Sequence, residues 1–223
     1  MLTLVLTRHG STPRSDPEQH LGQHLDLPLS DVGRSAAAAL GGRLAGLQFD
    51  RVVASPLRRS RETAALVATS ADVELDPRLI EMDYGRWEGL TYDEIEAADS
   101  EARRRWEADP ARLYCPGGES GDDVAARVTA FLDDLLAWTA GTDGRTPGAT
   151  GGRRALVVAH SSTNRVLLCV AMGVALRDYR RRFVQEPANL TVLGFDPAMG
   201  PGARLLVAND VSHLRGIRGD TWG

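Results

Sequence analysis

The chain has 223 residues, a mass of 24.0 kDa and a formal net charge of −4, with 26 basic against 30 acidic residues. That length fits one α/β domain with a sizeable core, and a hydrophobic content of 43% is ordinary for a soluble globular protein. The acidic balance speaks against a nucleic-acid partner, and no apolar run approaches the roughly 20 residues that cross a bilayer. We therefore expect neither a nucleic-acid nor a membrane partner.

The two cysteines favour a reducing compartment. Cys115 and Cys169 lie far apart, without C-x-x-C or Cys/His metal spacing. Cys169 falls in an apolar helical run, which is typical of a buried free thiol. The N-terminus has neither the charged region nor the cleavage site of a signal peptide, so a cytoplasmic protein is expected.

The first ten residues, MLTLVLTRHG, predict a strand with a functional end. Leu2 and Leu4–Leu6 form a nearly continuous apolar run, as in strands buried on both faces of a parallel sheet. The run stops at Arg8-His9-Gly10, and ligands of open α/β sheets bind beyond the carboxyl ends of the strands. A guanidinium and an imidazole at that point favour an anion such as phosphate, although a simple charged turn would look the same.

The next elements follow in a βα order. Ser30 and Asp31 offer an N-cap after a turn-rich stretch, and Pro56 suits the first turn of a helix. We predict a loop over 11–28, a helix over about 31–46, a strand over 49–55, a helix near 56–70 and a strand over 73–75.

The second half continues the alternation after an irregular segment around Gly85–Gly89. Residues 91–109 are strongly charged and helix-prone, which favours a solvent-facing cap, and Gly141–Gly152 has the composition of a flexible loop. The remaining predicted elements are a helix over Ser120–Trp138, a strand over 155–159, a helix to about Met172, and strands near 190–196 and 204–208. This pattern predicts a three-layer α/β sandwich, a mainly parallel sheet with helices on both faces, as one domain over 1–223 with a small helical cap insertion at about 87–118.

Two predicted buried strands end in a histidine, His9 and His160. If these strands are neighbours, both imidazoles lie at one edge of the sheet. The small polar residues 161–164 can open a helix whose N–H groups face an anion. One or two of the arginines at 58–61, after the second strand, can face the same crevice. Such a set suits the equatorial oxygens of a transferring phosphoryl group.

These residues, in this order, resemble the histidine phosphatase superfamily, also called the phosphoglycerate-mutase-like family. Each motif alone is weak, but six occur in the family's order over most of the chain. They are Arg8-His9-Gly10, Leu27-Pro28-Leu29-Ser30 with Gly33, Ser55-x-Leu57-x-Arg59 with Glu62-Thr63-Ala64, Glu81 with Gly85 and Trp87-Glu88-Gly89, Pro116-Gly117-Gly118-Glu119-Ser120, and Val157-Val158-Ala159-His160.

The resemblance implies roles for single residues. His9 is expected to be the nucleophile that becomes phosphorylated, and Glu81 the acid that protonates the leaving group. Arg8, Arg59 and a cationic His160 would neutralise the phosphoryl oxygens. No cofactor and no metal would be needed, because the guanidinium groups supply the positive charge.

Three positions depart from the family pattern. Ser11 stands where Glu or Gln is usual, Ser161 where Gly commonly follows the second histidine, and Ser15 where many members have Asn. Ser161 is retained as a phosphate-binding candidate. Candidate contacts with the rest of the substrate are Ser15, Gln23, His24, Trp87 and His213.

The other polar residues predict less. His20 and His24 are expected to be solvated loop residues for the most part, and His213 follows the last strand, where it would line the pocket or stand clear of it. Zinc is not expected, because no His/Glu spacing fits it. Trp87 fits a wall near the pocket or plain core.

The expected function is that of a metal-independent phosphomonoesterase, a histidine acid phosphatase-type enzyme acting on a small phosphorylated metabolite through phosphohistidine. The alternative is a phosphoglycerate-type mutase, although mutases of the family resemble longer chains with a larger insertion before the second histidine. A non-catalytic phospho-ligand binding module is a third interpretation, disfavoured because nucleophile and acid are both kept. The sequence leaves a homodimer and the identity of the substrate open.

Overall fold

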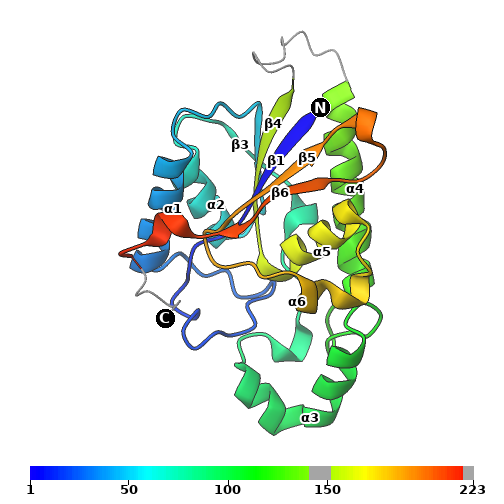
Figure 1. The fold of residues 1–223 in the computed structure, drawn as a ribbon. Helices are drawn as coiled ribbons and strands as arrows, with labels where there is room; N and C mark the ends of the chain where they lie inside the picture. Colours follow the sequence, from blue (N-terminus) through cyan, green and yellow to red (C-terminus); the bar gives the residue numbers. More distant parts are fainter. Residues whose placement is uncertain (141–151, 218–223) are drawn as a thin grey trace.

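A computed structural model describes residues 1–140 and 152–217 of the chain, so all but the last residue of the predicted loop Gly141–Gly152 lies outside the described residues. A six-stranded sheet in the order β3-β2-β4-β1-β5-β6 forms the middle of the fold (Figure 1). Its strands are β1 (Leu2–Arg8), β2 (Arg51–Ala54), β3 (Val73–Leu75), β4 (Arg153–Ala159), β5 (Leu190–Phe195) and β6 (Arg204–Asp210).

The sheet is mainly parallel, as predicted. β1 pairs in parallel with β4 from Leu2 opposite Arg153 to Arg8 opposite Ala159, and β2 runs parallel to β4 and β3. The strand β5 is antiparallel to both of its neighbours, which makes the sheet mixed at that edge. The register of β1 and β4 brings the two histidine-terminated strands side by side, because His9 and His160 each follow the last residue of their strand.

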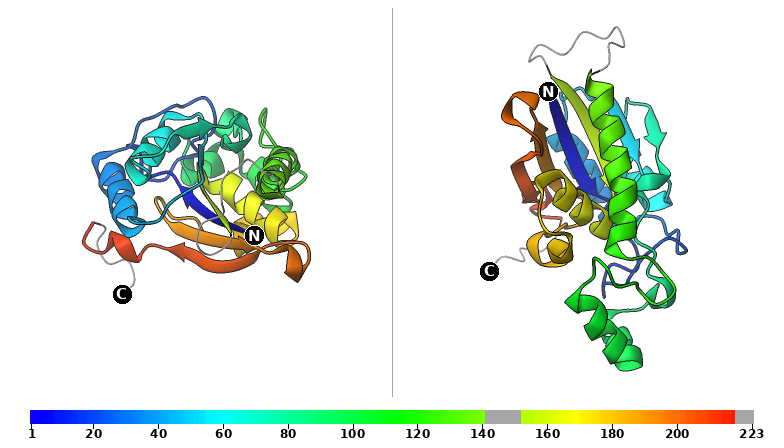
Figure 2. Two further views of the ribbon diagram at one scale, coloured as in Figure 1. Left: turned by 90° about the horizontal axis from the view of Figure 1, so that it is seen from above. Right: turned by 90° about the vertical axis from the view of Figure 1, so that its right-hand side faces the viewer.

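Helices cover both faces of the sheet (Figure 2). On one face, α1 (Asp31–Arg43) and α2 (Arg58–Val67) pack against Val5 and Val158. On the other, α4 (Gly121–Ala140) and α5 (Ser161–Met172) belong to the core that holds Leu4 and Leu6. Alternate residues of one strand thus serve opposite layers, which is why β1 is apolar along nearly its whole length. The three-layer sandwich predicted from the sequence is confirmed.

The helix boundaries differ slightly from prediction. Ser30 caps α1 through the N–H of Gly33, as expected, but α1 ends at Arg43 rather than near residue 46. Pro56 precedes α2 instead of lying in its first turn, so α2 begins at Arg58 after an N-cap, Leu57, that has no side-chain capping bond. The short helix α6 (Tyr179–Arg182) was not predicted.

The predicted cap region carries α3 (Tyr92–Ala108), which lies beyond the carboxyl ends of the strands, close to the 11–28 loop (Figure 1). A capping box between Thr91 and Glu94 starts this helix, and Asp99 interrupts its helical geometry. Although α3 is highly charged, its Ile95 and Trp106 are buried. The helix is therefore tied to the body of the protein by an apolar contact and not only by its chain ends.

Both cysteines are free and buried, as predicted for Cys169. Burial raises the pKa of the Cys115 thiol to about 12 and that of Cys169 to about 11. Among the residues that the structure describes, no helix is long and apolar enough to span a bilayer.

Candidate active site

The two histidines predicted to meet do so at the carboxyl end of the sheet. Their rings lie edge to face, with centroids 5.1 Å apart. His9 follows β1 and its backbone N–H donates to the carbonyl of Ala159, the residue that precedes His160. The pairing of β1 with β4 thus fixes the distance between the imidazoles.

Gly10 lets the chain turn away from β1 against the first turn of α1. A Cβ on Gly10 would lie 2.5 Å from the carbonyl oxygen of Gly33, and one on Gly33 would lie 2.0 Å from that of Ser11. Either contact is too short for a side chain. The glycine after His9 is therefore required by the close passage of two backbone segments, and the N–H of Gly10 donates to Thr63 of α2.

The surroundings of His9 set its tautomer and its charge. Nδ1 lies 2.7 Å from the carbonyl oxygen of Gly10, which can only accept, so Nδ1 carries the hydrogen and Nε2 keeps its lone pair. Nε2 accepts a hydrogen bond from Nε of Arg59 at 3.2 Å. Burial, followed by the charges of Arg59 and Arg8, lowers the pKa of His9 well below its usual value. The ring is neutral at physiological pH.

Arg59 is fully buried and held by the 11–28 loop. Besides His9, its guanidinium donates to the carbonyls of Leu21, Gly22 and Leu25 at 2.8–3.1 Å. Burial lowers the pKa of Arg59, but a guanidinium stays charged. The loop therefore holds the charged guanidinium of Arg59 in place beside His9.

Arg8 anchors the opposite side of the site. One of its terminal nitrogens donates to the carbonyl of Gln185 at 3.0 Å and the other to Glu18 at 2.7 Å. The carboxylate of Glu18 is half exposed, whereas Arg8 has 12% of its side chain exposed. The charge of Arg8, the main partner of Glu18, lowers the pKa of that carboxyl against the opposing effect of burial.

His160 lies fully buried behind His9. Its Nε2 is 2.7 Å from Oγ of Ser55 and 3.3 Å from Oγ of Ser60, while Nδ1 is buried without a partner. Burial, then the charge of Arg59, lowers the pKa of His160 well below its usual value. His160 is therefore neutral in the site as described, chiefly because it is buried, and a cationic His160 beside a bound phosphate stays a prediction.

Glu81 accepts hydrogen bonds from the helix N–H groups that were predicted to bind phosphate. Its two carboxylate oxygens accept hydrogen bonds from the backbone N–H groups of Met82, Ser162 and Thr163 and from the hydroxyl of Thr163, at 2.9–3.1 Å. The start of α5 thus orients the carboxylate, with only 3% of the residue exposed. Ser161, one residue earlier, faces the pocket.

A pocket that is partly open to solvent lies against this cluster. Arg8, His9, Glu81, Ser161 and Ser15 all line it. Arg59 and His160 have no exposed surface and stand behind His9. Five of the sequence candidates therefore line one cavity, and two more support it from within.

Three candidate substrate contacts lie elsewhere in the structure. The amide of Gln23 donates to the carbonyl of Glu81 and to Glu119, so Gln23 braces the segment that carries Glu81. Trp87 packs edge to face on Trp106 in the core, 5.5 Å between centroids. His213 contacts the carbonyl of Ala188 at 2.8 Å. Among the described residues these side chains are outside the pocket lining.

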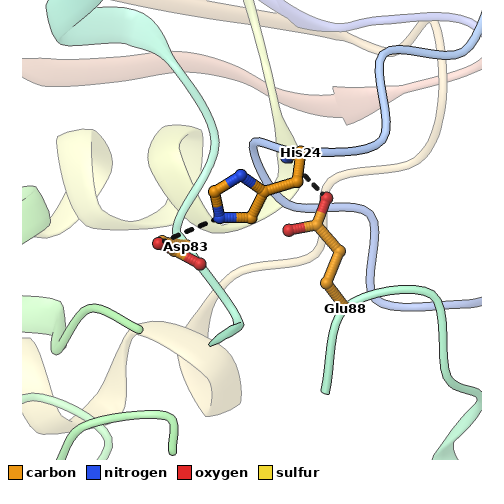
Figure 3. Close-up of side chains that lie close together, drawn as sticks. All are labelled: His24, Asp83 and Glu88. Carbon is orange, nitrogen blue, oxygen red and sulfur yellow. Dashed lines mark hydrogen bonds and ion pairs between the residues drawn. The ribbon is translucent and has the colours of Figure 1, made fainter. Parts of the chain in front are cut away.

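His24 is also outside the pocket lining, and it lies beside Asp83 and Glu88 (Figure 3). The ligand-type atoms of these three residues lie within 4.8 Å of one another, an arrangement that a cation could use. One oxygen of Glu88, however, accepts the backbone N–H groups of His24 and Leu25. These three residues hold the loop that lies above Arg59.

Sequence reasoning missed the other side of the pocket. His20 was expected to be solvated, but it is 6% exposed, with its ring edge to face with that of Tyr84 and tilted against that of Tyr92, at centroid distances of 4.8 and 4.7 Å. Burial lowers its pKa to about 4. Arg165 and Arg180 line the pocket as well. Arg165 lies five residues after His160, which is one turn beyond the start of α5 that faces the phosphate. Helical spacing could therefore have predicted that Arg165 lies on the same face of α5.

Residues 4–208 match the model of the histidine phosphatase superfamily (branch 1). The chain belongs to this family. It is 37% identical over 179 residues to glucosyl-3-phosphoglycerate phosphatase of Mycolicibacterium vanbaalenii, covering 79% of this chain and 76% of that one. A mycobacterial glucosyl-3-phosphoglycerate phosphatase, solved with VO3, superposes with a TM-score of 0.80 at 31% identity, covering 93% of this chain and 98% of that one.

A further relative is much longer than this chain. A bifunctional protein of Mycobacterium tuberculosis is 38% identical over 172 residues, which are 76% of this chain but 44% of that protein. The chain therefore spans less than half the length of that relative.

Proposed function

We propose that this protein is a metal-independent phosphatase that hydrolyses monoesters of small phosphorylated metabolites through a phosphohistidine on His9. The observation that carries the proposal is the neutral His9, with an unprotonated Nε2, in a pocket that it shares with Arg8 and Glu81. A neutral imidazole has the lone pair that attack on phosphorus needs. The family membership and the phosphatase names of two relatives support the same activity.

In the first step Nε2 of His9 gives up the hydrogen bond from Nε of Arg59 and attacks phosphorus, and the bond from phosphorus to the ester oxygen breaks. The Nδ1–H of His9 donates to Gly10, which holds the ring as positive charge develops on it. Arg8 and Arg59 offset the charge on the phosphoryl oxygens, and the buried Nδ1 of His160 offers a further polar contact. Ser161 is proposed to contact the phosphate from the start of α5.

Glu81 is proposed to handle the proton. In its acid form it protonates the departing alkoxide, and as the carboxylate it then takes a proton from the water that attacks phosphohistidine. That second attack releases inorganic phosphate and restores neutral His9. The backbone donors from α5 keep the carboxyl group in one orientation for both steps.

The decisive experiment measures phosphate release from p-nitrophenyl phosphate in the presence of EDTA, with wild type beside His9→Ala. We expect turnover that survives EDTA and that falls by about 10³-fold or more in the variant, as for loss of a nucleophile. An unchanged rate in His9→Ala would overturn the mechanism. Loss of turnover on EDTA treatment would overturn its metal independence.

A second experiment on the wild-type protein distinguishes a phosphatase from a mutase. A mutase must return the phosphoryl group to the substrate, so NMR of 3-phosphoglycerate would detect 2-phosphoglycerate without free phosphate. We expect free phosphate instead. Binding of phosphate esters without either reaction would favour the phospho-ligand binding module.

A further inference from the structure

The segment that carries Glu81 lies outside the helices and strands. Residues 80–84 run between two short 3₁₀ turns, Pro77–Leu79 and Gly85–Trp87. Proton transfer to a leaving group requires a hydrogen-bond distance, and a displacement of about 1 Å can cost about 10²-fold in rate. The backbone around Glu81 must therefore be held by groups from other parts of the chain.

Oε2 of Glu119 lies at the centre of this support. It accepts hydrogen bonds from the side-chain amide of Gln23 at 3.1 Å, from the backbone N–H of Asp83 at 2.9 Å and from the guanidinium of Arg127 at 3.4 Å. These donors come from the loop before α1, from the segment of the proton donor and from α4, respectively. One carboxylate oxygen thus joins three segments that are far apart in the sequence.

Two of the three donors also hold carbonyl groups at Glu81 and next to it. The amide of Gln23 donates to the carbonyl of Glu81 itself at 2.9 Å, and the guanidinium of Arg127 donates to that of Ile80 at 2.6 Å. The backbone N–H of Glu119 donates in turn to the carbonyl two residues after Glu81, at 2.8 Å. The backbone is thus held before, at and after Glu81 by Glu119 or by a side chain that its carboxylate binds.

The charge of Glu119 strengthens this arrangement. The side chains of Arg127 and Glu119 are 15% and 24% exposed, so salt screens their interaction less than that of an ion pair at the surface. Hydrogen bonds to an ionised acceptor are also stronger than those between neutral groups. Loss of the carboxylate would therefore release all three donors together.

We propose that Glu119 is a positioning residue for the proton transfer, which keeps the carboxyl group of Glu81 within reach of the leaving oxygen by holding the backbone around it. The proposal rests on the proposed function, since it assumes that Glu81 is the general acid. Gln23 lies in the loop whose carbonyls bind Arg59. The carboxylate of Glu119 therefore also sets the position of the acid relative to that of the buried guanidinium.

The test compares two esters whose leaving groups differ in their need for a proton. Glycerol 3-phosphate releases an alkoxide, whereas p-nitrophenyl phosphate releases a stable phenolate. In Glu119→Ala we expect kcat for glycerol 3-phosphate to fall about 30-fold while KM changes by less than about threefold. The kcat for p-nitrophenyl phosphate should stay within about threefold of wild type. Glu119→Gln keeps an oxygen that can accept at the position of Oε2, so it should recover most of the lost rate.

Asp123→Ala is the matched control for a loss of stability in the same stretch of chain. The carboxylate of Asp123 accepts the N–H and the hydroxyl of Ser120, at 2.9 and 2.7 Å, and among the described residues it forms no hydrogen bond with 80–84. Thermal melts accompany the kinetics, and Asp123→Ala should keep the wild-type ratio of the two rates. A ratio that falls in Asp123→Ala as far as in Glu119→Ala would mean general loosening and would overturn the positioning role.

A double variant shows whether Glu119 acts through Glu81. Glu81→Gln combined with Glu119→Ala should hydrolyse glycerol 3-phosphate about as slowly as Glu81→Gln alone, because a positioning residue has no effect once the acid is gone. Losses that multiply in the double variant, or an equal loss for both esters in Glu119→Ala, would overturn the proposal.

Failure of the positioning role and failure of the proposed function give different results. An unchanged ratio in Glu119→Ala contradicts only the positioning role if Glu81→Gln still shows the dependence on the leaving group. Amide hydrogen exchange tests the hold on the backbone without turnover. The N–H of Asp83 should exchange about tenfold faster in Glu119→Ala and at the wild-type rate in Asp123→Ala. Unchanged exchange in Glu119→Ala would overturn the positioning role even if wild type is an active phosphatase.

Discussion

The two sides of the pocket are built in different ways. The strand-end cluster (Arg8, His9, Arg59, Glu81 and His160) follows the strands, and backbone groups or serine hydroxyls hold every member. The helix-side cluster (Tyr92, Arg165 and Arg180) comes from α3, α5 and α6. Within it, Arg180 lies over the rings of Tyr92 and Trp106 and donates to the hydroxyl of Tyr92. Hydrogen bonds to backbone fix direction closely, whereas stacking fixes a plane. The first arrangement suits chemistry at one atom, and the second suits recognition of a group.

The largest effect should come from the strand-end cluster. Arg59→Met removes the charge beside Nε2 of His9 and leaves three loop carbonyls without their donor. We expect kcat/KM for p-nitrophenyl phosphate to fall about 10³-fold and the free energy of unfolding to drop by about 3 kcal/mol. Arg61→Met, an exposed position on α2, is the control. A variant that stays within tenfold of wild type would mean that Arg59 is only structural.

Glu81→Gln tests the proton step and should have the next largest effect. The fold should be retained, although the new amide N–H₂ faces backbone donors at Ser162 and Thr163. Loss of a general acid should lower kcat for an alkyl phosphate such as glycerol 3-phosphate by about 10²-fold. The loss should be much smaller for p-nitrophenyl phosphate, whose leaving group needs no proton. An equal loss for both esters would contradict the role of general acid.

The same contrast explains what the sequence could predict. β1 and β4 are apolar along their length and end in histidine, and parallel strands end at one edge, so the meeting of His9 and His160 followed from the pattern. Family motifs added Arg59 and Glu81, which periodicity alone does not single out. The three-layer sheet followed from the alternation of strands and helices.

The helix-side cluster could not be predicted in this way. Its members depend on how α3 folds back over the strand ends and on the short α6, and neither has a periodic signature that fixes its direction. His20 illustrates the difficulty, because a histidine in a polar loop looks solvated until Tyr84 and Tyr92 enclose it. Trp87 is the reverse case, since a tryptophan between glycines suggested a pocket wall and packs in the core instead.

The enclosure of His20 can be tested by measuring how the free energy of unfolding depends on pH. Its pKa is lowered to about 4 in the folded protein, from an ordinary 6.5, chiefly by burial. Between pH 4 and pH 6.5 the unfolded chain binds a proton at His20 that the folded protein does not bind. The contribution of neutral His20 to the free energy of unfolding is therefore present above pH 6.5 and is lost as pH falls toward 4. Urea unfolding at pH 7 and pH 4 should give wild type a loss about 3 kcal/mol larger than that of His20→Gln. His24→Gln, exposed in the same loop, should behave like wild type; equal losses in His20→Gln and wild type would mean that the imidazole charges freely.

The smallest effect is expected where the two sides meet, at Glu18. Its carboxylate pairs with Arg8 and also faces Arg165, so it competes with any anion for the same guanidinium groups. Because the side chain is 52% exposed, water screens this competition and its removal should change binding only modestly. We expect Glu18→Gln to tighten inhibition by inorganic phosphate or vanadate about threefold at low salt, with the gain shrinking as salt rises. Glu101→Gln removes the same charge from α3 at an exposed position outside the pocket lining and should leave the inhibition constant unchanged. Weaker inhibition in Glu18→Gln would mean that Glu18 orients Arg8 for the phosphate instead of competing with it, and the carboxylate would then belong to the strand-end cluster.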